Sequence, residues 1–119
     1  MKILTLIIKQ KFFDEIIDGT KKQEFREIRP NTNNKYCKLD DEGYPEEKEG
    51  ILIPRSYDAI QFYVGYNKDR ANALVEITGS NIELLVDDNG EFIEYEHNGE
   101  IYTSAQIVYD LGKVLNKNV

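Results

Sequence analysis

Short alternating segments separated by turn dipeptides are the feature that most limits how this chain can fold. Residues 57–66 alternate apolar Ile60, Phe62 and Val64 with polar or small residues. This two-residue period is typical of a half-buried strand. Residues 71–80 repeat the alternation after a short polar connection. The two segments therefore predict a β-hairpin.

Two more hairpins are predicted further along the chain. Residues 82–86 and 92–96 flank the turn-forming run 87–90, and the pair Asn98-Gly99 lies between two strand-like segments. Asn-Gly is a strong hairpin signal because both residues tolerate a positive φ. The sequence therefore predicts a mainly β (α+β) fold. Closure into a β-barrel is the simplest way to bury the strand edges.

Helical signal is confined to a small part of the chain, so we expect one or two short helices. Within residues 10–18, Phe13, Ile16 and Ile17 share one helical face. Gly19 follows, and glycine commonly ends a helix because it adopts the left-handed conformation without strain. A second helical turn is predicted near residues 103–106.

Residues 2–9 precede this helix and are almost continuously apolar. Such a run is typical of a central strand that is buried on both faces.

The segment after Gly19 carries alternating charges. On a regular strand Lys22, Glu24 and Arg26 would share one face. Lys21 would then point away from Glu24. The two side chains can converge only if Lys21 still belongs to the turn after Gly19, or to a bulge.

Lys21, Glu24 and Arg26 are the strongest candidates for chemistry. A lysine beside a carboxylate can take part in proton transfer or nucleophilic attack. Arginine offers a planar fork of donors to a phosphate, a carboxylate or a base edge. The alternative is that Glu24 and Arg26 simply pair on an exposed strand, a contact that contributes little stability.

The spacing Gly19, Lys21, Glu24, Arg26 after a short helix resembles the G-x-K-x-x-E-x-R motif of ASCH domains, a family of PUA-like β-barrels. Residues 1–9 and 106–115 are similar to the first and closing strands of that family. The resemblance implies a cleft that binds RNA, a nucleotide or a modified nucleoside. The ligand-binding residues that it implies are Lys21, Lys22, Glu24, Arg26 and Arg29.

A bacterial branch of this family hydrolyses N4-acetylcytidine with a Lys, a Thr and a Glu. If this chain is such an amidohydrolase, Lys21 and Glu24 are its catalytic residues, although Glu24 stands where that branch has Thr. Glu76 and Glu83 are candidates for the late glutamate. A further alternative is a protein-interaction module that uses the acidic residues 40–49.

Length and charge favour one domain with a local ligand site. The 119 residues fit a single domain covering residues 1–119, with a long acidic loop at residues 35–56. The formal net charge of −7 argues against indiscriminate binding to phosphate backbones. Residues 1–38 carry nine Lys or Arg and five acids, a net charge of +4, so the rest carries −11. The motif therefore lies in the basic third of an acidic chain.

Several kinds of site are excluded by composition. One cysteine, Cys37, and one histidine, His97, cannot form a disulfide or a structural zinc site, and no nucleophile accompanies His97. We expect no cofactor and no metal. No signal peptide is recognisable, and the apolar run 3–8 is too short to span a bilayer. We expect a soluble, cytoplasmic monomer that does not contact a membrane.

Stacking on bases would depend on tyrosine and phenylalanine, because the chain has no tryptophan. An exposed tyrosine is more often structural than a stacking platform. The tyrosines expected to be exposed are Tyr36, Tyr44, Tyr66 and Tyr95.

Overall fold

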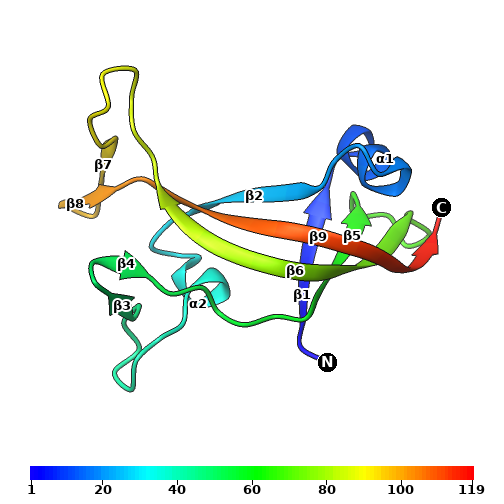
Figure 1. Ribbon diagram of the computed structural model, residues 1–119, viewed down its shortest axis with the longest axis horizontal. Coiled ribbons are helices and arrows are strands. Elements are labelled where there is room, and N and C mark those ends of the chain that lie inside the picture. The colour runs from blue at the N-terminus through cyan, green and yellow to red at the C-terminus, as the bar shows by residue number, and fades with distance from the viewer. The chain divides into compact units, whose positions relative to one another are not determined.

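The computed structural model describes residues 1–119 and shows a mainly β protein (Figure 1). Strands hold 53% of the residues and helices 11%, which confirms the predicted class. The chain forms two compact units, each assembled from segments that are distant in sequence. The first unit contains residues 1–24, 56–79 and 109–119, and the second contains residues 25–55 and 80–108. A single domain covering the whole chain stays a prediction.

The largest sheet has five strands in the order β1-β5-β6-β9-β2. Their bounds are β1 Ile3–Ile8, β2 Gln23–Ile28, β5 Ala59–Val64, β6 Asn72–Leu84 and β9 Ala105–Asn118. Strands β1 and β2 stand at the two ends of this order, and the sheet is not closed into a barrel. The expected barrel is therefore not confirmed.

The core of the first unit forms where β1 runs parallel to β5 (Figure 1). Leu4 lies opposite Ile60 and Leu6 opposite Phe62, and all four side chains are buried. Helix α1 (Gln10–Asp18) packs against β5 through the apolar face expected from its spacing. Of that face, Phe13 and Ile16 are buried and Ile17 is half-buried.

The prediction that the first strand is central and buried on both faces is wrong. β1 ends the strand order, and its burial alternates. Leu4, Leu6 and Ile8 are buried, whereas Ile3 and Thr5 are exposed. The run is nearly all apolar, yet only one of its faces is covered.

The predicted first hairpin is confirmed. β5 pairs antiparallel with β6, with Ile60 opposite Val75 and Phe62 opposite Ala73. All four residues are buried. The alternation of the sequence therefore identifies Ile60 and Phe62 correctly, whereas Val64 is only half-buried and the buried Ala59 lies outside the pattern.

The second unit contains a short helix, α2 (Asn33–Tyr36), that the sequence did not predict. Because Tyr36 ends this helix and is buried, the expectation that it is exposed is wrong. Neither α1 nor α2 is long and apolar enough to cross a membrane.

The acidic segment after α2 is held by backbone hydrogen bonds. The Lys38 amide donates to the Ile53 carbonyl at 2.8 Å, and the Glu46 amide donates to the Lys38 carbonyl at 2.8 Å. The short strands β3 (Glu47–Lys48) and β4 (Ile51–Leu52) pair antiparallel within it. This segment therefore contains pairing that its composition did not indicate.

The Asn98-Gly99 hairpin is confirmed. It joins β7 (Glu94–His97) to β8 (Glu100–Thr103), and both turn residues have positive φ, 53° and 83°. The turn at 87–90 is also present, closed by a bridge between Val86 and Phe92. The helical turn predicted near 103–106 is wrong, because β8 ends at Thr103 and β9 begins at Ala105.

The end of α1 can be tested by substituting Gly19. Its φ is +86°, and an added Cβ would meet no atom within 4 Å, so backbone strain is the only cost. We expect Gly19→Ala to lower the free energy of unfolding by about 1–2 kcal/mol, measured by urea denaturation. Gly19→Asn is the control, because asparagine tolerates this conformation better and should lose less. An alanine variant as stable as the wild type would contradict this account.

Candidate functional site

The turn after α1 positions the motif lysine. Gly19 ends the helix by donating its amide to the Ile16 carbonyl, and the Lys21 amide donates to the Glu15 carbonyl at 3.0 Å. Lys21 therefore lies in the turn, two residues before β2 begins. This is one of the two placements that would allow its side chain to reach Glu24.

Hydrogen bonds across this turn hold its shape. The Thr20 hydroxyl donates to Asp18 Oδ1 at 2.6 Å, and the Thr20 amide donates to the same oxygen at 2.8 Å. Because both bonds stabilise the carboxylate, they hold the pKa of Asp18 below its ordinary value, with the hydroxyl the larger cause.

Lys21 and Glu24 converge. Lys21 Nζ lies 3.2 Å from Glu24 Oε1, and the two side chains are 17% and 7% exposed. Burying a carboxylate is costly unless a cation and hydrogen-bond donors accompany it. The ammonium group supplies the charge while keeping partial access to solvent.

Phe12 adds an aromatic surface that the helical pattern of residues 10–18 did not indicate. It lies on the outer side of α1, and Lys21 Nζ is 5.5 Å from its ring centroid. This distance falls within the range of a cation–π interaction. An exposed phenylalanine outside the apolar face of the helix was the only signal that could have identified it.

The other basic residues of the motif have different surroundings. Lys22 is exposed, and its carbonyl accepts a hydrogen bond from the Leu111 amide. Arg26 is half-buried on β2, on the same strand face as buried Ile28.

Arg29 is held by its neighbours within the second unit. Its guanidinium pairs with the Glu27 carboxylate, and its centre lies 4.1 Å from the centroid of the Tyr95 ring. The sequence suggested Arg29 as a ligand-binding residue and did not indicate either partner.

The two candidates for a late glutamate are placed differently. Glu76 lies on β6 in the first unit, where its Oε1 accepts a hydrogen bond from the Lys113 amide at 3.4 Å. Glu83 is an exposed residue of the second unit.

Charge is distributed unequally between the units. The first unit has nine Lys or Arg and eight Asp or Glu, a formal net charge of +1. The second unit has six Lys or Arg and fourteen Asp or Glu, a formal net charge of −8. The Lys21–Glu24 pair therefore lies in a nearly neutral part of an acidic protein, where an anionic ligand is not repelled by a large net charge.

No group of three or more His, Cys, Asp or Glu side chains is arranged to hold a metal ion.

Comparison of the chain with family models, curated proteins and solved structures found no significant match.

Removing the charge of Glu24 tests whether the pair is needed for stability. Glu24→Gln keeps the shape but leaves the Lys21 ammonium without its carboxylate. We expect a loss of about 1–3 kcal/mol in the free energy of unfolding, measured by urea denaturation. Glu27→Gln, an exposed position on the same strand, is the matched control and should change stability by less than about 1 kcal/mol. Equal effects of the two substitutions would show that burial of Glu24 has no energetic consequence.

The hydrogen bonds between Thr20 and Asp18 lead to a prediction about how stability depends on pH. Thr20→Val removes the hydroxyl donor, so the pKa of Asp18 should rise toward its ordinary value, while Thr20→Ser should keep it low. A pKa lowered by folding gives stability that is present at neutral pH and is lost as the pH falls through the folded-state value. The wild type should therefore lose more stability on acidification than Thr20→Val. An NMR pH titration of the Asp18 carboxyl gives the pKa directly, and an unchanged value in Thr20→Val would refute this assignment.

Proposed function

We propose that this chain is a PUA-like domain of the ASCH type that binds an RNA element, a nucleotide or a modified nucleoside. The observation that carries the proposal is the contact between Lys21 and Glu24 in the turn after Gly19. The motif suggested both residues as ligand-binding groups. The structural feature that supports this suggestion is their convergence, which a regular strand would not give.

A buried ion pair is a weak explanation for stability and a better one for binding. Replacing such a pair with apolar side chains often leaves a protein as stable or more stable, because desolvation offsets the attraction between the charges. An ammonium has three donors and a carboxylate has about four acceptor sites, so each group can make several hydrogen bonds at once. In the proposed complex Lys21 donates to a phosphate or base acceptor, and Glu24 accepts from a base amino group.

The charge of the first unit limits the size of the ligand. A net charge of +1 does not provide the basic surface that a long nucleic-acid track requires. We therefore propose a ligand of one or a few nucleotides, held by Lys21, Lys22 and Glu24. A contribution from Arg26 or Arg29 remains a prediction from the motif.

Amide hydrolysis is the second candidate, and the 3.2 Å separation of Lys21 Nζ and Glu24 Oε1 favours it. This separation suits proton transfer between the two groups. In hydrolysis of N4-acetylcytidine, water would attack the acetyl carbonyl and the bond from the carbonyl carbon to N4 would break. The products would be acetate and cytidine, with a proton delivered to the departing N4.

The deciding experiment incubates purified protein with N4-acetylcytidine and follows cytidine formation by liquid chromatography. In parallel, NMR measures binding of a short single-stranded RNA and of the nucleoside. We expect binding without turnover, weakened about tenfold or more by Lys21→Ala. RNA binding should also weaken with added salt.

Lys117→Ala is the matched control, because it removes the same charge from an exposed position of the same unit. It should leave binding nearly unchanged. Turnover that disappears in Lys21→Ala would instead establish the amidohydrolase. Absence of both binding and turnover would overturn the proposal.

A further inference from the structure

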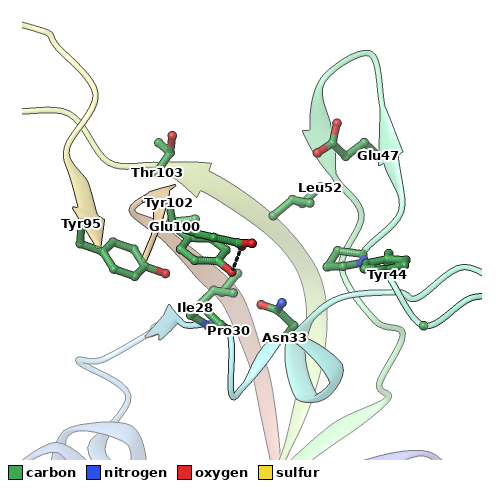
Figure 2. Close-up of a pocket in the computed structure, with 13 residues that line it drawn as sticks. Ile28, Pro30, Asn33, Tyr44, Glu47, Leu52, Tyr95, Glu100, Tyr102 and Thr103 are labelled. Carbon is green, nitrogen blue, oxygen red and sulfur yellow. Dashed lines mark hydrogen bonds between the residues drawn. The ribbon is translucent and has the colours of Figure 1, made fainter. Parts of the chain in front are cut away.

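A pocket of about 590 Å³ lies entirely within the second unit (Figure 2). Tyr95, Glu100 and Tyr102 of the β7–β8 hairpin line one side. Tyr44 and Leu52 of the acidic segment line the opposite side. The pocket contains none of the residues that the motif suggested for ligand binding.

Three tyrosines give this pocket an aromatic lining. Tyr95 and Tyr102 face each other across the hairpin, with ring centroids 5.7 Å apart and planes inclined by 21°. Tyr44 stands across the pocket from them and is 67% exposed. Because Tyr95 already contacts Tyr102 and the Arg29 guanidinium, Tyr44 and Tyr102 are the rings that offer surface to a ligand.

Carboxylates accompany the rings. Tyr102 donates its hydroxyl to Glu100 Oε2 at 2.9 Å, a bond drawn in Figure 2, and Glu47 lies at the edge of the pocket. That hydrogen bond raises the pKa of Tyr102 above its ordinary value. No lysine or arginine is among the lining residues.

The charge around the pocket selects against anions. The second unit carries a net formal charge of −8, so a phosphate would enter a repulsive field. A cation already lies against one of the rings, since the Arg29 guanidinium is 4.1 Å from the Tyr95 centroid. Tyrosine faces attract cations through the ring quadrupole, most strongly when the cation is desolvated.

We propose that this pocket binds a small organic cation through its alkylammonium group. The rings of Tyr44 and Tyr102 would contact the charged head, Leu52 would contact its carbon atoms, and Glu47 and Glu100 would balance its charge. This role goes beyond the proposed nucleotide site, uses other residues and does not depend on it.

The test uses choline and its neutral isostere 3,3-dimethylbutan-1-ol, which has the same shape without the positive charge. Each is titrated into the full chain, and binding is followed by NMR on the tyrosine ring signals and by calorimetry. We expect choline to shift the Tyr44, Tyr95 and Tyr102 signals and to bind about tenfold or more tightly than the isostere. Equal binding of the two, or no binding of choline, would overturn the proposal.

Two variants locate the site. Tyr44→Leu removes an exposed ring without disturbing the core, and Glu100→Gln removes one charge. We expect each to weaken choline binding about fivefold. Tyr66→Leu is the control, because Tyr66 is 84% exposed and lies in the first unit. Choline binding unchanged by both pocket variants would refute this location.

Cytidine serves as the competing probe, because a neutral base can also stack on tyrosine. Cytidine that shifts these tyrosine signals at lower concentration than choline would show a base-binding pocket and overturn the cation proposal. Failure of choline to bind would leave RNA binding by Lys21 untouched, so the two proposals can fail separately.

Discussion

Burial of the Glu24 carboxylate is the constraint on which the candidate site depends. A carboxylate removed from water needs a cation close by, and an ideal strand would direct Lys21 to the other face. The left-handed residue Gly19 resolves this conflict by ending α1 and starting a turn that contains Lys21. The ammonium then approaches Glu24 from the turn, 3.2 Å from its oxygen. The end of α1, the turn that follows it and the burial of Glu24 therefore depend on one another.

Periodicity predicted the strands better than it predicted their position in the sheet. Alternation in residues 57–66 predicts the burial of Ile60 and Phe62, because a half-buried strand covers every second residue. It does not report which strand lies at an edge. Residues 3–8 are nearly all apolar, yet β1 is an edge strand with exposed Ile3. Helix α2 was missed because its four residues are too few to show a helical period.

The candidate site could be predicted only where its contacts are local. Lys21 and Glu24 are three residues apart, and the sequence predicted that they could meet only if Lys21 lay in the turn after Gly19 or at a bulge. Lys21 lies in that turn, and the contact is present. The tyrosine pocket depends on more distant relationships. Tyr95 faces Tyr102 because of the hairpin register, which Asn98-Gly99 made predictable. Tyr44 lies at the same pocket in a turn of the acidic segment, where its carbonyl accepts a hydrogen bond from the Asp40 amide, and neither composition nor periodicity indicated this turn.

The distribution of charge along the sequence and its distribution in the folded structure lead to different expectations about where an anion binds. The first 38 residues are basic, which favoured a local anionic or polar ligand at the motif. In the structure this basic segment is divided between the units, and Arg29 belongs to the one with a net charge of −8. There it contacts Glu27 and Tyr95. An arginine engaged in this way must give up both contacts to bind a phosphate. Lys21 also has partners, Glu24 and the Phe12 ring, but its side chain keeps partial access to solvent. Anion binding is therefore expected at the turn after α1, and the aromatic pocket is better matched to a cation.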